Sequence, residues 1–295
     1  MGRFGTVVTA MVTPFRPDGT LDAEAAGTLA RWLADHGSDA LVVAGTTGES
    51  PVLSDPERIE LFHAVRAAVD VPLIAGATTN DTAHSVDMAV AAAEVGVDAI
   101  LAVVPYYNKP TQAGMDGHFR AIAAASDLPV MLYDVPGRTG IKLQIATTLL
   151  LAREVPTIVA LKDAGGDVVQ TAELLAAAPE GFDVYSGDEP LSLAFAAYGA
   201  VGVVGVASHW TGLQQQEMFA AFAKGDVVTA HQINARLMAS YRYMNSDTCV
   251  FAQAAKVAMG VLGVPAGECR LPLGPPPEGK DRDARRVLTD LGYPI

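Results

Sequence analysis

The sequence is poor in the features that mark secreted, membrane or metal-binding proteins. Its 295 residues include only two cysteines, Cys249 and Cys269, without a Cys-x-x-Cys pair, which excludes a disulfide framework and fits a reducing compartment. Pro, Gly or a charged residue interrupts every apolar stretch well short of the ~20 residues that a membrane span needs. The histidines lack the regular spacing of metal ligands, so the sequence predicts no metal site.

Positive charge is scarce as well. Lys and Arg number 20 against 33 Asp and Glu, a formal net charge of −13. A surface this acidic repels nucleic-acid backbones and anionic membranes. The first residues, Met-Gly-Arg-Phe-Gly-Thr, lack the basic and then apolar pattern of a secretory signal. We therefore expect a cytoplasmic protein with no nucleic-acid or membrane partner.

The chain alternates between short apolar runs and longer amphipathic stretches rich in Ala and Leu. Near-continuous hydrophobicity is typical of parallel strands that are covered on both faces. Eight such units predict a (β/α)₈ barrel, an α/β fold; the alternative is an open doubly wound sheet, but no Gly-x-Gly-x-x-Gly opens a helix. The predicted strands are Val7–Val12, Ala40–Ala44, Pro72–Ala75, Ala99–Val104, Val130–Val135, Ile158–Lys162, Phe182–Tyr185 and Gly202–Ala207.

Local signals mark the helices between these strands and the change of pattern near the C-terminus. Ser54 and Glu57 form a predicted capping box, and Asp22 is a predicted N-cap. From Asp226 to about Gly263 the pattern is helical without strands, and a last helix is expected around 282–291. We therefore predict a barrel over residues 1–225 and a C-terminal helical domain over 226–295. Cys249 is expected to pack within an apolar helix of that domain.

Lys162 is the first candidate for chemistry, because it is the one lysine that interrupts a predicted strand. Burial disfavours the charged ammonium and lowers the pKa of a lysine. A neutral amine can attack a carbonyl and form a Schiff base. The alternative is a structural ion pair with Asp163 or another carboxylate.

Other strand ends carry residues that complement such a lysine. Thr46 and Thr47 lie in a Gly-Thr-Thr-Gly turn, whose amides and hydroxyls suit a carboxylate or phosphate. Tyr133 could exchange protons near the barrel axis, and Arg138 suits a second carboxylate. Each has an ordinary structural explanation by itself: a glycine turn, a core tyrosine, a surface arginine. A phosphate cradle formed by the strand-eight glycines is a further alternative, although close packing of small residues is the preferred interpretation.

These motifs together resemble the dihydrodipicolinate synthase / N-acetylneuraminate lyase superfamily over essentially the whole chain. The motifs that carry the resemblance are Gly45-Thr46-Thr47-Gly48-Glu49-Ser50, Pro105-Tyr106-Tyr107, Tyr133 through Gly140, Leu161-Lys162-Asp163 and Ser186-Gly187-Asp188.

The resemblance implies a Schiff-base lyase that acts on pyruvate without a metal or cofactor. It assigns the imine to Lys162 and a proton relay to Tyr133, Thr46 and Tyr107. It assigns binding of the pyruvate carboxylate to Thr46 and Thr47. Gly187 and Val204 match positions whose backbone lies near pyruvate. In the superfamily the second tyrosine comes from a neighbouring subunit, which implies a homo-oligomer, usually a tetramer built as a dimer of dimers.

Arg138 distinguishes the branches of this superfamily. The sugar-acid and sialic acid lyases resemble the chain at the lysine and the threonine loop but lack this arginine. The resemblance therefore implies the branch that condenses pyruvate with L-aspartate 4-semialdehyde to 4-hydroxy-tetrahydrodipicolinate, in lysine and diaminopimelate biosynthesis. The alternatives are another pyruvate-dependent aldolase, a phosphate-binding barrel enzyme and a non-catalytic 2-oxo-acid binder.

Two departures from the superfamily pattern affect these expectations. Asp134 stands where many members have Asn. His84 occupies a position where lysine-inhibited members carry an acidic residue. The same members carry histidines where this chain has Asp55 and Arg58. Because a histidine cannot hold an ammonium group as a glutamate does, we predict weak or absent inhibition by lysine.

Overall fold

The computed structural model describes residues 2–246 and 248–295, in which eight parallel strands follow one another in chain order around a closed barrel. This confirms the predicted (β/α)₈ architecture. The strands lie within one or two residues of their predicted ends: β1 Val7–Ala10, β2 Ala40–Val43, β3 Leu73–Ala75, β4 Ala99–Val103, β5 Val130–Asp134, β6 Ile158–Asp163, β7 Asp183–Ser186 and β8 Gly202–Gly205.

By its internal contacts the chain divides into two compact units, and each is described separately. Unit 1 comprises Met1–Thr6 and Pro72–Val204, and unit 2 comprises Val7–Val71 and Gly205–Ile295. The predicted boundary after Gly225, between a barrel and a C-terminal helical domain, does not correspond to this division and stays a prediction.

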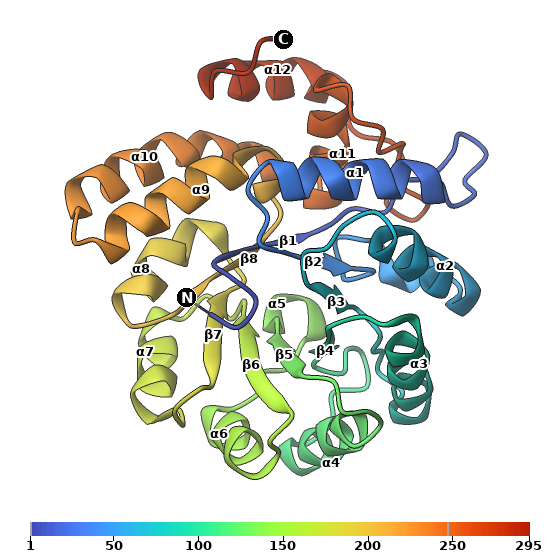
Figure 1. Ribbon diagram of the computed structural model, residues 1–295, viewed down its shortest axis with the longest axis vertical. Coiled ribbons are helices and arrows are strands. Elements are labelled where there is room, and N and C mark those ends of the chain that lie inside the picture. Colours follow the sequence, from blue (N-terminus) through green and yellow to red (C-terminus); the bar gives the residue numbers. More distant parts are fainter. Residues whose placement is uncertain (1, 247) are drawn as a thin grey trace. The chain divides into compact units, whose positions relative to one another are not determined.

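Unit 1 holds β3 to β7 and most of β8. Its strand residues are almost all buried, as expected for strands covered on both faces. Most helices of this unit contact a neighbouring helix along the outside of this part of the sheet (Figure 1). They are α3 Thr82–Val95, α4 Gln112–Ala123, α5 Pro136–Thr139, α6 Ile145–Glu154, α7 Val168–Ala177 and α8 Ser192–Ala197, with a 3₁₀ turn at Glu189–Leu191.

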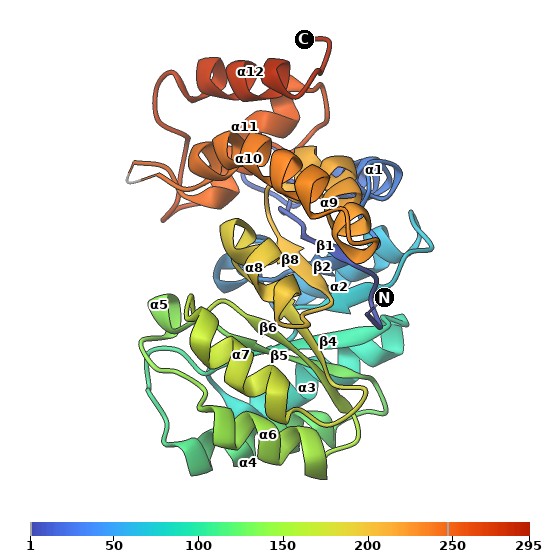
Figure 2. The ribbon, with the colours of Figure 1, turned by 90° about the vertical axis from the view of Figure 1, so that its left-hand side faces the viewer.

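Unit 2 holds β1, β2 and the C-terminal helices. Helix α9 contacts β1, and α10 and α11 contact α9 (Figure 2). The helices of this unit are α1 Ala23–Asp35, α2 Asp55–Arg66, α9 Ser208–Ala223, α10 Val227–Met244, α11 Phe251–Val261 and α12 Lys280–Asp290, with a 3₁₀ turn at Ser50–Val52.

The local helix signals are confirmed. The Asp22 carboxylate caps α1 by accepting from Ala25 N–H, and Ser54 and Glu57 form the capping box of α2. These side chains satisfy N–H groups that a helix start would otherwise leave without a partner.

The placement of Cys249 within a helix is wrong. The helical stretch predicted from Asp226 to about Gly263 consists of two helices, and α10 ends at Met244 whereas α11 begins at Phe251. Polar residues after Met244 favour a loop, and Ser246 forms an isolated antiparallel bridge with Cys249. Cys249 therefore precedes α11 rather than lying within a helix, although it is buried as expected.

Candidate active site

Lys162 and Tyr133 face each other across two neighbouring strands of unit 1. They are paired residues in the register of β5 and β6, and paired residues point to the same face of a sheet. The Lys162 Nζ atom lies 4.3 Å from the centre of the Tyr133 ring, and both side chains are buried. The expected alignment of these strands is confirmed.

Burial lowers the pKa of Lys162 from 10.5 to about 8. The charge of Glu189 opposes this change and that of Arg138 reinforces it. A substantial share of the amine is therefore neutral near physiological pH, as a nucleophilic lysine requires.

The position of Asp163 argues against its pairing with Lys162. Neighbouring residues of a strand point to opposite faces. The Asp163 carboxylate accepts hydrogen bonds from the Thr171 hydroxyl at 2.6 Å and from Gly165 N–H at 2.8 Å. It is thus engaged with the segment that leads into α7 rather than with the lysine.

Gly187 adjoins Lys162 at the end of β7. Its N–H donates to the Asp163 carbonyl at 2.7 Å. A Cβ atom at this position would lie 2.7 Å from Ala164 Cβ and 3.1 Å from Lys162 Cγ. Only glycine therefore fits without displacing the lysine stem. Val204 is buried in β8, one residue after Val203, which pairs with Ser186 of β7.

Arg138 lies in the short helix α5 after β5 and is exposed. The helix ends at Gly140, whose φ of 72° is left-handed. A Cβ atom at Gly140 would come within 2.9 Å of Lys109 Cε, so the loop after β4 packs against the loop that carries the arginine. The exposed guanidinium is accessible to a substrate carboxylate.

Tyr107 differs from the buried Lys162 in its exposure. It is 90 % exposed and has a φ of 70°, a backbone conformation that aromatic residues rarely adopt. The Asn108 N–H donates to the Tyr106 carbonyl at 2.8 Å, which makes Tyr107 the centre of a three-residue turn that projects its ring outward. Strained residues of this kind concentrate at functional sites.

Thr46 and Thr47 belong to unit 2, where they form a tight turn after β2. Glu49 N–H donates to the Thr46 carbonyl at 3.1 Å, and Ser50 N–H donates to the Gly45 carbonyl at 3.2 Å. Thr47 is buried and Thr46 is half-buried. The predicted turn is therefore present.

Of the predicted site residues in unit 1, the structure brings Lys162, Tyr133 and Gly187 together. Arg138 acts on this group electrostatically, because its positive charge lowers the pKa of Lys162. Sequence analysis missed Glu189, which is buried and acts electrostatically on Lys162. The signal that could have found it is an acidic residue directly after the Ser186–Asp188 motif.

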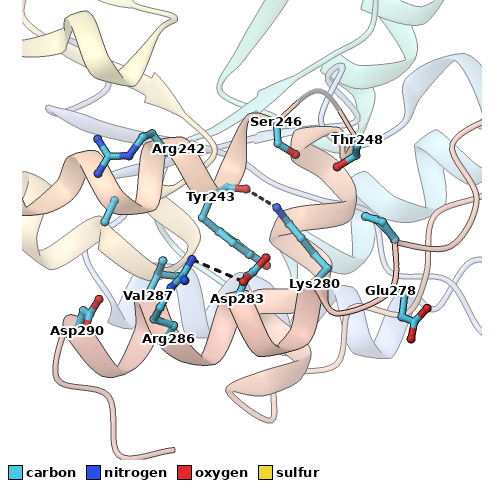
Figure 3. Close-up of a pocket in the computed structure, with 12 residues that line it drawn as sticks. Arg242, Tyr243, Ser246, Thr248, Glu278, Lys280, Asp283, Arg286, Val287 and Asp290 are labelled. Atoms are coloured by element: carbon cyan, nitrogen blue, oxygen red, sulfur yellow. Dashed lines mark hydrogen bonds and ion pairs between the residues drawn. The ribbon is translucent and has the colours of Figure 1, made fainter.

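Other places that could bind a ligand do not contain the predicted chemistry. Among the residues that the structure describes, no cluster of three or more His, Cys, Asp or Glu could hold a metal ion. A cavity of about 440 Å³ lies among the C-terminal helices, with Arg242, Tyr243 and Lys280 in its wall (Figure 3). It includes none of the predicted site residues. At Gly202 a Cβ atom would meet the Thr6 carbonyl oxygen at 2.0 Å, which supports close packing rather than a phosphate cradle there.

In the part of the chain that the structure describes, no helix is long and apolar enough to cross a membrane.

Comparison with known proteins gives a consistent result. The model of the dihydrodipicolinate synthetase family matches residues 3–291. A 4-hydroxy-tetrahydrodipicolinate synthase of Symbiobacterium thermophilum is 46 % identical over 294 residues, which cover 99 % of each chain. A dihydrodipicolinate synthase structure from Bacillus anthracis has a TM-score of 0.92 and 43 % identity over 100 % of both chains. One from Cyanidioschyzon merolae with lysine bound has a TM-score of 0.94 and 42 % identity over 99 % of both chains. The family match, the relatives and the fold agree that the chain belongs to the dihydrodipicolinate synthetase family.

Proposed function

We propose that this chain condenses pyruvate with L-aspartate 4-semialdehyde to form 4-hydroxy-tetrahydrodipicolinate, as a Schiff-base lyase. One observation carries the proposal: a buried lysine with a pKa of about 8 faces a tyrosine across two barrel strands. The curated relatives that bear the name of this activity match nearly the full length of the chain.

The first step forms the imine. In this proposal the amides and hydroxyls of Thr46 and Thr47 hold the pyruvate carboxylate. The neutral Lys162 amine attacks the ketone carbon, and the carbonyl oxygen leaves as water after protonation through Tyr133. The amine must reach the carbonyl carbon and the proton donor must reach the carbonyl oxygen of the same ketone, which their paired register favours.

The second step forms the carbon–carbon bond. Loss of a proton from the pyruvate methyl group gives an enamine, which attacks the aldehyde carbon of the semialdehyde. The semialdehyde amine then attacks the imine carbon and displaces Lys162, so the ring closes and the free lysine returns. No electrons are transferred to or from an outside group, and the family needs no cofactor for the reaction.

Arg138 supports the choice of the second substrate. An exposed guanidinium suits bidentate capture of a carboxylate, and L-aspartate 4-semialdehyde carries one beside its amine. A polyol aldehyde, as a sugar-acid lyase would use, gives such a cation no partner. This argues against another pyruvate-dependent aldolase on the same scaffold, and a non-catalytic binder would need neither Lys162 nor Tyr133.

The exposed Tyr107 supports a homo-oligomer. A ring that is 90 % exposed on a strained turn is well suited to reach into the site of a neighbouring copy. We propose that Tyr107 completes the proton relay of a partner subunit and that the assembly is a tetramer built as a dimer of dimers.

The test is reductive trapping. The protein is incubated with pyruvate and sodium borohydride, the intact mass is measured and the adduct is mapped to a peptide. A pyruvyl adduct confined to Lys162, and absent from Lys162→Arg, would support the mechanism. No adduct, or one spread over surface lysines, would refute it. The enzyme without borohydride is then assayed with pyruvate and a panel of aldehydes, and the aldehyde that it consumes is the acceptor.

A further inference from the structure

Glu49 closes the threonine turn in an unusual backbone conformation. Its φ is 59°, in the left-handed region, and its N–H donates to the Thr46 carbonyl. Its side chain is almost completely buried, with 1 % of its surface exposed. A left-handed conformation at a residue other than glycine costs free energy and persists only where the surrounding structure holds it. The contacts of the Glu49 carboxylate therefore help to hold the turn.

The partner of that carboxylate comes from the C-terminal part of unit 2. The ammonium of Lys256, on α11, lies 2.6 Å from Glu49 Oε1, and 2 % of the lysine side chain is exposed. The second oxygen, Oε2, accepts from Arg270 N–H at 2.9 Å. Lys256 also donates to the Glu268 carbonyl at 2.8 Å. Both carboxylate oxygens are therefore engaged by residues more than 200 positions away in the sequence.

Further contacts hold the same turn. The Phe15 ring lies 4.4 Å from Lys256 Nζ and 4.1 Å from the Arg270 guanidinium carbon, which favours both cations at this place. The Thr13 hydroxyl donates to the Gly48 carbonyl at 2.6 Å. The turn is thus fixed at two successive residues, once through its backbone and once through its carboxylate.

A buried ion pair contributes little net stability, because desolvation of both charges offsets their attraction. Its value lies in directional constraint, since hydrogen bonds to a charged group are short and well aligned. We propose that Glu49 and Lys256 are positioning residues that hold the Thr46–Thr47 turn in the geometry that binds the pyruvate carboxylate. This inference rests on the proposed function and gives the C-terminal helix α11 a role in pyruvate affinity.

A second buried lysine supplies the matched control. Lys280 is the first residue of α12. Its Nζ atom donates to the Tyr243 backbone carbonyl at 2.5 Å and lies 4.0 Å from the centre of the Tyr243 ring (Figure 3). It resembles Lys256 in burial and in its aromatic neighbour, but its contacts are to α10 rather than to the threonine turn. Lys280→Met therefore reports the general effect of removing a buried lysine from the C-terminal helices.

The experiment measures the pyruvate concentration that gives half-maximal borohydride trapping at Lys162, well below the Tm of each full-length variant. Lys256→Met is expected to raise this concentration about tenfold or more, because a small displacement of a binding group has effects of this size. At saturating pyruvate the adduct still forms, since Lys162 and Tyr133 are intact. Lys280→Met is expected to stay within about twofold of the unaltered protein.

Glu49→Gln keeps the size of the side chain and decides the outcome if Lys256→Met does not fold. It is expected to raise the half-saturating concentration, and Glu49→Gln combined with Lys256→Met should be no worse than Lys256→Met alone, because the two residues act through one contact. A Glu49→Gln value equal to that of the unaltered protein, or an equal rise in Lys280→Met, overturns the inference. An unaltered protein that forms no Lys162 adduct overturns the proposed function instead.

Discussion

The amine of Lys162 lies 4.3 Å from the centre of the Tyr133 ring, across paired positions of β5 and β6. The aromatic face attracts the protonated amine, whereas burial disfavours it. Burial has the larger effect, and the pKa of Lys162 falls to about 8. The residue therefore changes its protonation state close to physiological pH, and this has a kinetic consequence.

We expect the rate of imine formation at limiting pyruvate to depend on pH with a midpoint near 8. Only the neutral amine attacks the ketone, so below the pKa of Lys162, about 8, the rate should fall about tenfold for each pH unit. Above the midpoint it should level off. Borohydride trapping or stopped-flow measurement of adduct formation across this range gives the profile. A midpoint near the ordinary lysine value of 10.5 would show that the amine is not desolvated in the working enzyme.

Tyr133→Phe should separate proton transfer from packing. The variant keeps the ring that faces Lys162 and loses only the hydroxyl. Because positioned general acids and bases contribute about 10²–10⁴-fold, we expect kcat to fall by about 10²-fold or more with little change in the KM for pyruvate. Steady-state kinetics at several pyruvate concentrations provides the measurement. Full activity in this variant would assign the proton relay to other groups.

Arg138→Gln and Arg138→Lys test the recognition of the second substrate. We expect both to raise the KM for aspartate 4-semialdehyde by about tenfold or more, because a lysine cannot reproduce the bidentate geometry of a guanidinium. Trapping of pyruvate should be unchanged when it is measured above the pKa of Lys162, which removes the electrostatic influence of Arg138 on that amine. Unaltered semialdehyde kinetics in both variants would show that the acceptor is bound elsewhere.

The fold was predictable because its strands are buried on both faces and so appear as uninterrupted apolar runs. The run at Ala99–Val104, for example, became β4 with a difference of one residue. Lys162 could be singled out for the same reason, since a charged residue inside such a run is conspicuous. Its alignment with Tyr133 followed only once the strands were assumed to be parallel and adjacent.

Contacts between distant segments could not be predicted in this way. Glu49 appeared in a motif, but nothing in the periodicity of α11 indicates that Lys256 would meet it, because the two are 207 positions apart. The break after Met244 was missed because the sequence on both sides of it is helical. In each case the deciding interaction is tertiary, whereas sequence periodicity reports only local structure.

Inhibition by lysine is expected to be weak or absent. His84 lies in the first turn of α3, and its Nδ1 atom lies 3.3 Å from the Thr79 hydroxyl oxygen. A histidine offers no fixed negative charge to the ammonium of an effector, in contrast to a carboxylate. A titration of the initial rate with lysine gives the measurement, and His84→Glu should be inhibited more strongly than the unaltered protein. Strong inhibition of the unaltered protein below millimolar lysine would contradict this expectation.

Asp134 lowers the stability of the protein at neutral pH, and Asp134→Asn should relieve this effect. Burial raises the pKa of Asp134 from 3.8 to about 6. The hydrogen bond from Leu143 N–H partly offsets this rise, and the charge of Asp163 reinforces it. The native state therefore binds more protons than the unfolded chain between these values, so stability falls as the pH rises from about 4 to about 6.

Above the folded pKa of about 6 the full penalty remains, whereas an asparagine at this position is neutral and its Oδ1 atom can still accept the bond from Leu143 N–H. We expect Asp134→Asn to raise the free energy of unfolding at pH 7 by about 1 to 2 kcal/mol. The gain should shrink as the pH falls and vanish below the ordinary aspartate pKa of 3.8, where the carboxyl is protonated in both the folded and the unfolded state. Denaturant unfolding at several pH values measures the difference. Asp163→Asn is the control: it loses the acceptor of the Thr171 hydroxyl and should lower the free energy of unfolding. A gain that is the same at every pH would show that Asp134 acts through packing rather than through its charge.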